Sequence, residues 1–205
     1  MSILNTLTAE LYNEHPAKVQ GLRHEAMDPT STYKTAKIFG NPDPRPAKTA
    51  LYDKSLRGTG TLAYNIDPQD VKSVYPAEGM QLEREIGPYP LIGINPDMLK
   101  IKDEDFRSSV LHHEKGHSAQ PGKMKLKTIH AFTDYGLVPL GLMLIEGGVE
   151  WALERRGIKS PTSYWDKTSR IKQPYSIYRD FVRELDEKQP GIMRQIYRVA
   201  SRASP

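Results

Sequence analysis

Residues 103–119 read DEDFRSSVLHHEKGHSA, and signals at both ends of this stretch predict a single helix. Asp103 is a suitable N-cap, because its carboxylate can accept hydrogen bonds from backbone N–H groups of the first turn. Pro121-Gly122 stops the helix shortly after Ala119. An apolar face with helical spacing begins at the N-terminal end, with Phe106, Val110 and Leu111.

The C-terminal part of this helix contains the pattern His-Glu-x-x-His, formed by His113, Glu114 and His117. Residues four apart lie on the same face of a helix, so both imidazoles can reach one metal ion. Glu114 points to the side of that pair, where it can meet a metal-bound water. A catalytic zinc ion needs one further protein ligand and an open fourth position.

The third ligand must come from elsewhere in the chain, because His117 is followed by SAQPGK and no third histidine lies close by. Glu146 is the best candidate. It lies in the apolar stretch LMLIEGGVEWAL, where an ionised carboxylate is costly unless a partner compensates it.

Glu150 lies one helical turn after Glu146, and the two carboxylates would repel each other unless a cation lay between them. We expect Glu150 to accept a hydrogen bond from the distal nitrogen of a ligand histidine, His113, and so to orient its ring. Gly147 and Gly148 each cost about 1 kcal/mol of helix stability relative to alanine. Close packing of the helix at this point would explain that cost.

The remaining sequence predicts an α+β fold with a small mixed or antiparallel sheet in the N-terminal half and a mostly helical C-terminal half. TLAYNI (61–66) and PLIGIN (90–95) are typical of strands. The second strand is either an ordinary sheet strand or the cleft edge that pairs with an extended substrate. Helices are expected over 1–27, from about 139 to Gly157, and over 164–200 with breaks at Pro174 and Pro190-Gly191.

Composition narrows the class of protein. The 205 residues, 38% hydrophobic and 26% charged, are typical of a globular chain, and we expect a single domain, 1–205, with lobes of about 1–120 and 121–205. The absence of cysteine excludes disulfides, thiolate zinc sites and a cysteine nucleophile. The N-terminus lacks the pattern of a secretory signal, and no apolar run approaches the roughly 20 residues of a membrane span, so we expect a cytoplasmic protein.

The pattern of His113, Glu114 and His117 with a downstream Glu146 resembles the gluzincin class of zinc metallopeptidases, which includes thermolysin and the zinc aminopeptidases. The resemblance covers residues 103–157 and implies a zincin-like catalytic domain that binds Zn²⁺ and hydrolyses peptide or protein substrates. It implies that Glu114 is the general base and Glu146 the third zinc ligand. Glu150 lies where that class often has aspartate.

A second likeness covers residues 174–198, which are similar in layout to the aminopeptidase segment where Pro-Tyr opens a helix. It implies that Tyr175 donates a hydrogen bond to the oxyanion. Tyr178, Tyr135 and His130 are alternatives for that role, and either Tyr175 or Tyr178 can instead be a packing residue. The chain lacks a G-x-M-E-N segment, so the sequence does not favour an exopeptidase over an endopeptidase.

Three alternatives remain beside this prediction. A purely structural zinc site would recruit a further ligand such as His112, His130 or Glu150, although such sites usually use cysteine. Without a metal, Glu146 and Glu150 would be held by Arg155 or Arg156. A basic adaptor for nucleic acid is the third, but the net charge of +4 is spread along the chain and no recognised module is present, so nucleic acid is not expected as a partner. A di-iron bundle is excluded, since it needs a second Glu-x-x-His pair.

Overall fold

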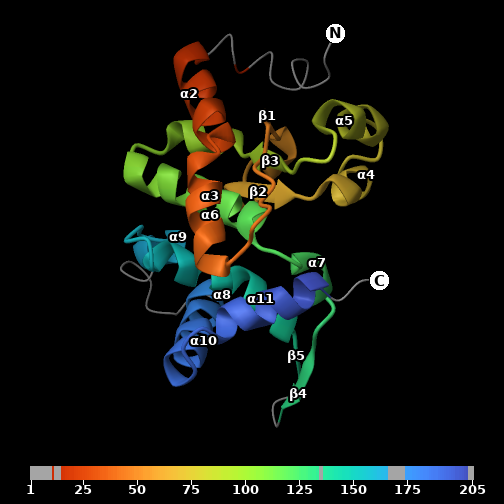
Figure 1. Cartoon of the computed structure of the whole chain (residues 1–205). Helices are drawn as coiled ribbons and strands as arrows, with labels where there is room; N and C mark the ends of the chain where they lie inside the picture. The colour runs from red at the N-terminus through yellow and green to blue at the C-terminus, as the bar shows by residue number, and fades with distance from the viewer. Residues whose placement is uncertain (1–10, 12–14, 134–135, 166–173, 203–205) are drawn as a thin grey trace. The chain divides into compact units, whose positions relative to one another are not determined.

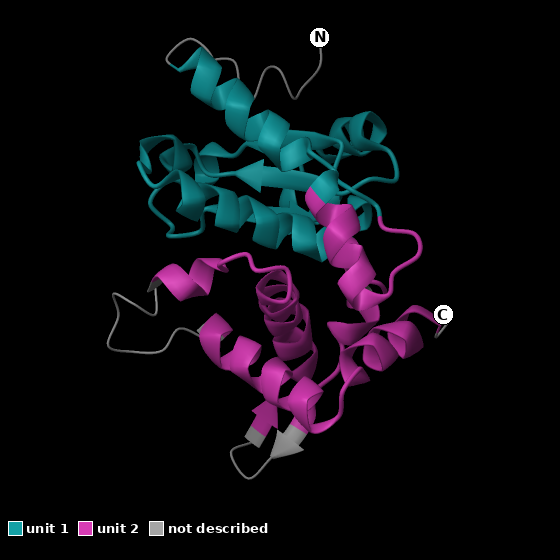
Figure 2. Ribbon diagram, turned by 60° about the vertical axis from the view of Figure 1, so that its left-hand side comes forward, with its two compact units in different colours: residues 1–30, 45–118 teal, residues 31–44, 119–205 magenta. Residues whose placement is uncertain are grey.

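The structure, a computed structural model, describes residue 11 and residues 15–133, 136–165 and 174–202. The chain divides into two compact units, which Figure 2 shows in different colours. Unit 1 comprises residues 1–30 and 45–118, and unit 2 comprises residues 31–44 and 119–205. The division after residue 118 lies close to the lobe boundary predicted near residue 120, whereas residues 31–44 group with the C-terminal unit.

Unit 1 is an α+β unit built on a small sheet (Figure 1). Its strands are β1 (Thr49–Tyr52), β2 (Ala63–Ile66) and β3 (Leu91–Ile94). Its helices are α2 (Pro16–Met27), α4 (Val71–Val74), α5 (Gly79–Ile86) and α6 (Glu104–Ala119), with 3-10 turns at Lys54–Leu56, Pro68–Asp70 and Pro96–Lys100. The predicted strands at 61–66 and 90–95 and the helix at 103–119 are confirmed, whereas β1, α4 and α5 were not predicted.

The three strands form a mixed sheet in the order β1-β3-β2. β3 runs parallel to β1 and antiparallel to β2, so the predicted small mixed sheet is confirmed. Because both edges of β3 are hydrogen-bonded within the sheet, this strand cannot also pair with an extended substrate. Of the two roles left open for residues 90–95, the ordinary sheet strand is confirmed and the cleft edge is wrong, since β1 and β2 are the edge strands of this sheet.

Both faces of the sheet are covered, because successive strand residues point to opposite sides. On β1, Ala50 and Tyr52 join a core with residues of α2 and α6, while Leu51 faces a second core with residues of α4 and α5. The first core includes Val19, Leu22, Ile92, Ile94, Val110 and Leu111; the second includes Ile66, Val71, Leu82, Ile86 and Leu91. The helix that carries the His-Glu-x-x-His pattern is therefore seated on a buried sheet face.

Unit 2 is mostly helical. Its helices are α3 (Thr30–Phe39), α7 (Lys123–Leu126), α8 (Leu140–Glu154), α9 (Pro161–Trp165), α10 (Pro174–Lys188) and α11 (Ile192–Arg202). The predicted helix after residue 139 and the break at Pro190-Gly191 are confirmed, and α10 begins at Pro174, whereas residues 166–173 lie outside the described part of the chain. The sequence did not predict α3 or the antiparallel hairpin of β4 (Ala131–Thr133) and β5 (Gly136–Val138). No helix described in either unit is both long and apolar enough to cross a bilayer.

An aromatic cluster lies in the core of unit 2. The ring of Phe39, on α3, meets Tyr197, on α11, edge to face at 4.8 Å between centroids, and lies 6.3 Å from the ring of Trp151, on α8. Arg156 then donates to Ser31 Oγ and Thr35 Oγ1, at 2.8 and 2.6 Å. These contacts explain why α3 belongs to unit 2 although it precedes the sheet in the sequence.

The helix α8 packs unusually close to its neighbours at Gly147 and Gly148. A Cβ atom at Gly147 would lie 2.2 Å from the backbone carbonyl oxygen of Tyr178, on α10. A Cβ atom at Gly148 would lie 1.9 Å from the hydroxyl oxygen of Tyr197. The close packing predicted for this Gly-Gly pair is confirmed.

We predict that Gly147→Ala destabilises the chain by about 1–3 kcal/mol, because the backbone of α10 must move to admit the methyl group. Gly21→Ala is the matched control on α2, where a new Cβ atom would have no neighbour within 4 Å. Higher helix propensity should make that control neutral or more stable by up to about 1 kcal/mol. Urea unfolding of both variants measures the effect; equal stability of the two would contradict the packing.

Candidate metal centre

The helix α6 begins where the sequence predicts. Asp103 Oδ1 accepts a hydrogen bond from the backbone N–H of Phe106 at 2.9 Å, which satisfies one of the free donors of the first turn. Glu104 and Asp105 add negative charge there, where the helix dipole favours it. The N-terminal end of α6 is therefore fixed by local chemistry, and the phase of the helix downstream follows.

His113 and His117 lie together on one face of α6, and both are buried. Their Nε2 atoms are 3.2 Å apart, with the ring planes inclined at 82°. Two imidazole nitrogens bound to one tetrahedral zinc ion at its usual bond length of about 2.05 Å would be about 3.3 Å apart. The separation of the two nitrogens thus fits shared coordination of one ion.

Polar contacts fix α6 within unit 1. Lys115, 1% exposed, donates from Nζ to the backbone carbonyl of Glu25 at 2.7 Å, where α2 ends. The hydroxyl of Ser108 donates to the carboxylate of the same Glu25. Near the other end, Asn65 on β2 donates from Nδ2 to Ser118 Oγ at 2.8 Å. These contacts hold the helix at several points along its length, with the two histidines between them.

Glu114 is buried on the same helix, directly after His113. A buried carboxylate keeps its charge only where donors or cations compensate the lost hydration. His113 and His117 share one face of α6. The side chain of Glu114, one residue after His113, leaves the helix at a different angle around its axis.

Glu146 and Glu150 lie one turn apart on α8 in unit 2. Glu146 is half-buried, whereas Glu150 is fully buried. The chain immediately after α6 contacts this helix: Gln120 donates from Nε2 to the backbone carbonyl of Ile145 at 2.7 Å. Gln120 follows His117 by three residues in the chain, and Ile145 directly precedes Glu146. Gln120 belongs to none of the motifs identified in the sequence.

Tyr197 is a second residue beside Glu146 that the sequence did not reveal. Its hydroxyl donates to the carbonyl of Leu144 at 2.7 Å and accepts from Gln120 Nε2 at 2.9 Å. Burial raises the pKa of Tyr197 above its usual value; the hydrogen bond from Gln120 opposes the shift, and the negative charge of Glu146 adds to it. Tyr197 therefore stays protonated and supports the backbone of α8.

The arginines that would hold Glu146 and Glu150 in a metal-free alternative are engaged elsewhere. Arg155 pairs with Asp186 at 3.1 Å, and Arg156 donates to Ser31 and Thr35 on α3. Within the part of the chain that the structure describes, neither guanidinium forms an ion pair with Glu146 or Glu150. This alternative is therefore wrong in its choice of partners.

Glu150 has a partner that the sequence did not predict. Its Oε2 accepts a hydrogen bond from the hydroxyl of Thr162, at the start of α9. The bond from His113 to Glu150, inferred from the spacing of the motifs, stays a prediction.

The candidates for oxyanion donor differ in exposure. Tyr175 and Tyr178 lie in the first turns of α10, with ring centroids 6.0 Å apart, and Tyr175 is 39% exposed. The backbone of Tyr178 packs on Gly147, next to Glu146. His130 is exposed, and its Nδ1 lies 3.2 Å from the Thr128 carbonyl. Tyr135 lies outside the described residues, and His112 is half-buried on α6.

Comparison with known proteins finds no matching family model, no matching curated protein and no matching solved structure. Any statement about function therefore depends on the chemistry of these side chains.

Because the two histidine nitrogens are spaced for one zinc ion, we predict that zinc binding stabilises the folded chain. At free zinc 100 times its Kd, linkage adds about 2.7 kcal/mol, which for a chain of this size raises Tm by about 5–11 °C. His117→Gln should lose most of this rise, whereas the exposed His130→Gln should keep it. Differential scanning calorimetry with and without zinc measures both; an undiminished rise in His117→Gln would contradict the site.

Proposed function

We propose that the protein is a zinc-dependent metallopeptidase of zincin-like fold, in which His113, His117 and Glu146 hold the metal and Glu114 is the general base. The observation that carries this proposal is the 3.2 Å separation of the two buried Nε2 atoms on α6. Two imidazoles with a carboxylate are a ligand set found in catalytic zinc sites, and they leave a fourth position open.

Two observations support Glu146 as the third ligand. Among the described residues, His113, His117 and Glu146 form a group that could hold a metal ion. Independently, the Gln120 amide binds the carbonyl of Ile145, so the chain leaving α6 contacts α8 beside Glu146. Glu146 is half-buried on α8, and removing a carboxylate from water costs free energy unless a cation or hydrogen-bond donor compensates it, as a metal ion would here.

The residues of the site divide the chemistry between them. A zinc ion held by His113, His117 and Glu146 would supply Lewis-acid chemistry, lowering the pKa of a water to about 7 and polarising the substrate carbonyl. The carboxylate of Glu114 would accept a proton as the water oxygen bonds to the carbonyl carbon, and would deliver it to the amine that leaves when the C–N bond breaks. Tyr175 donates from its hydroxyl to the oxyanion that develops on the carbonyl oxygen, with Tyr178 as the alternative donor.

The edge strand β2 supports a peptide as substrate. An extended peptide binds a sheet only where a strand edge can pair with it, and β2 rather than the central β3 lies at an edge. Asn65 on β2 is hydrogen-bonded to Ser118, the residue after His117. A peptide paired with β2 would therefore run beside the end of the helix that carries both histidines.

We predict that Glu114→Gln retains zinc near wild-type stoichiometry and loses peptide hydrolysis by a factor of about 10²–10⁴, the usual contribution of general base catalysis. Metal content by mass spectrometry and digestion of a peptide library, each with and without chelator, measure the two properties. Glu104→Gln, an exposed carboxylate on the same helix, is the matched control and should keep full activity.

Each outcome of that experiment has a clear meaning. Full activity in Glu114→Gln contradicts the proposed base. Stoichiometric zinc without peptide hydrolysis in the wild type supports a structural metal site instead, while absence of bound zinc after reconstitution contradicts the metal site itself.

The two tyrosines can be separated by hydroxyl deletion. We predict that Tyr175→Phe lowers kcat by about 10²–10³ with little change in KM, because a donor to the oxyanion acts mainly in the transition state. Tyr178→Phe is the matched control one turn later and should change kcat only slightly. Steady-state kinetics on one peptide substrate decide between them, and the reverse pattern would assign the role to Tyr178.

A further inference from the structure

The charged residues of the chain divide unequally between its two units. Unit 2 contains 17 Lys and Arg but 10 Asp and Glu, a net charge of +7. Unit 1 contains 12 Lys and Arg and 15 Asp and Glu, a net charge of −3. The net charge of +4 for the whole chain is therefore the sum of one basic unit and one acidic unit. Such a charge asymmetry is typical of proteins that bind a polyanion.

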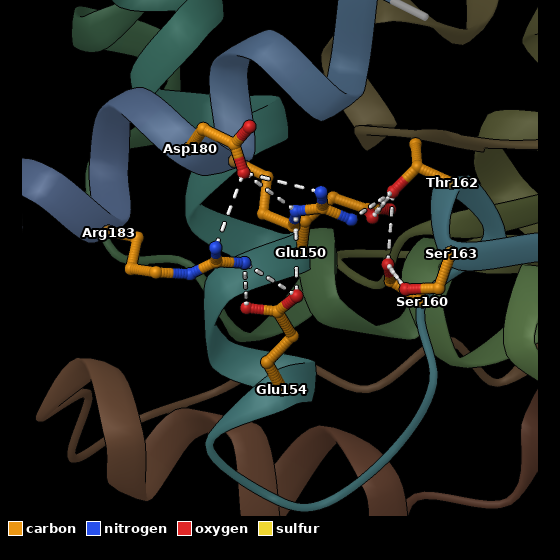
Figure 3. A network of polar contacts seen from close by, with 8 residues as sticks. Glu150, Glu154, Ser160, Thr162, Ser163, Asp180 and Arg183 are labelled. Atoms are coloured by element: carbon orange, nitrogen blue, oxygen red, sulfur yellow. Dashed lines mark hydrogen bonds and ion pairs between the residues drawn. The ribbon is translucent and has the colours of Figure 1, made fainter. Parts of the chain in front are cut away.

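The acidic residues of unit 2 gather on two helices, where arginines pair with them. Seven of the ten lie on α8 and α10. Glu154 and Asp180 both form ion pairs with Arg183, at 2.8 and 3.4 Å (Figure 3). Arg155 pairs with Asp186 at 3.1 Å. The negative charge of unit 2 is thus largely balanced by cations of α8 and α10 themselves.

Three other helices of unit 2, α3, α7 and α11, contain lysine and arginine but no aspartate or glutamate. Their cations are Lys34 and Lys37 on α3, Lys123 and Lys125 on α7, and Arg194, Arg198 and Arg202 on α11. Lys123 is buried and Lys125 half-buried, whereas the other five are exposed. Within the described residues, no carboxylate forms an ion pair with any of the three arginines of α11.

The three helices without acidic residues are in contact with one another. Arg194, in the first turn of α11, donates from Nε to the backbone carbonyl of Ile38 on α3 at 2.9 Å. Gly122 directly precedes α7, and a Cβ atom there would lie 2.5 Å from the backbone carbonyl carbon of Ala200, near the end of α11. Figure 1 shows α7 and α11 side by side. All the cations named above except Lys123 therefore form one basic surface, which the even spread of charge along the sequence does not reveal.

The arginines of α11 form a row. Arg194, Arg198 and Arg202 follow one another at intervals of four residues, so they lie on one side of the helix, with Cα atoms about 6 Å apart along its axis. The apolar side of α11 packs inside the unit, where Met193 and Tyr197 are 0% exposed. A guanidinium can form two parallel hydrogen bonds to the oxygens of one phosphate. A row of exposed arginines is therefore suited to a row of phosphates.

Nucleic acid suits this surface better than a membrane does. A helix that lies in a membrane interface buries an apolar face in the lipid, whereas the apolar face of α11 belongs to the core of unit 2. Among the described residues of α11, Val199 is the one large hydrophobic side chain that is exposed. Tyr33, 50% exposed, lies four residues before Lys37 and shares a face of α3 with it. An exposed aromatic ring beside a cation can stack on a base.

We propose that the basic surface of α3, α7 and α11 binds nucleic acid through its phosphate backbone, with Arg198 and Arg202 as phosphate contacts. Phosphate contacts carry no sequence information, so this binding is independent of base sequence. Each phosphate that a cation neutralises releases condensed counterions, so the affinity falls as the salt concentration rises. The inference does not depend on the proposed peptidase activity, because none of these residues is a proposed metal ligand or catalytic group.

The experiment measures the affinity of the full chain for two short fluorescent probes, duplex DNA and single-stranded RNA, by anisotropy over a series of salt concentrations. The double variant Arg198→Gln/Arg202→Gln should bind more weakly than the wild type. The slope of log affinity against log salt should fall by about 0.9 per arginine for the duplex and about 0.7 per arginine for the single strand. Lys18→Gln/Arg84→Gln removes two exposed cations of unit 1 and is the matched control, which should keep the wild-type slope.

A smaller slope in the α11 variant with an unchanged slope in the control supports the proposal. Absence of binding to both probes overturns it, and so does an equal slope in the α11 variant and the wild type. An equal loss in the control overturns it as an effect of net charge alone. Binding to phosphatidylserine vesicles but to neither probe overturns it in favour of a membrane surface. Should the double variant not fold, Arg202→Gln alone should lose the slope of one arginine, and an unchanged slope there overturns the proposal.

Discussion

The close approach of α8 to α10 and α11 constrains everything that this helix carries. At Gly147 the backbone carbonyl of Tyr178 occupies the place of a side chain, and at Gly148 the hydroxyl of Tyr197 does so. Neighbours at this distance determine both the position of α8 and its rotation about its own axis. Glu146 precedes these glycines and Glu150 follows them. The packing of α8 within unit 2 therefore determines the directions of both side chains.

Three buried charges among the described residues, those of Asp53, Lys115 and Glu150, are compensated by fixed donors or acceptors. Asp53, in unit 1, accepts from Ser55, Tyr64 and Tyr75; burial raises its pKa, but these hydrogen bonds outweigh burial and hold the pKa below its usual value. Lys115 is compensated by the carbonyl at the end of α2, and Glu150 by the Thr162 hydroxyl. Burial of a charge costs free energy unless such partners are in place before the charge is needed.

The proposed site combines a local element with a distant one. The histidine pair is local, because helical periodicity alone brings residues 113 and 117 to one face. The carboxylate of Glu146 is distant in sequence, and its place depends on contacts such as that of Gln120 with the backbone of Ile145. Gln120 and Tyr197 both form hydrogen bonds to the turn of α8 that precedes Glu146. Neither residue belongs to a recognised motif, yet both help to fix the position of Glu146.

Short-range physical chemistry was sufficient for several features to be read from the sequence alone. The cap at Asp103, the spacing of His113 and His117, the strands β2 and β3 and the close packing at Gly147-Gly148 all follow from residue types within one or two turns of each other. The sequence did not determine that β3 is the central strand, that α3 joins unit 2, or that Glu150 accepts a hydrogen bond from Thr162. Strand order, helix docking and side-chain partners depend on which segments bury their apolar faces together, and only the tertiary structure decides that, because the gain in free energy is shared among residues far apart in the chain.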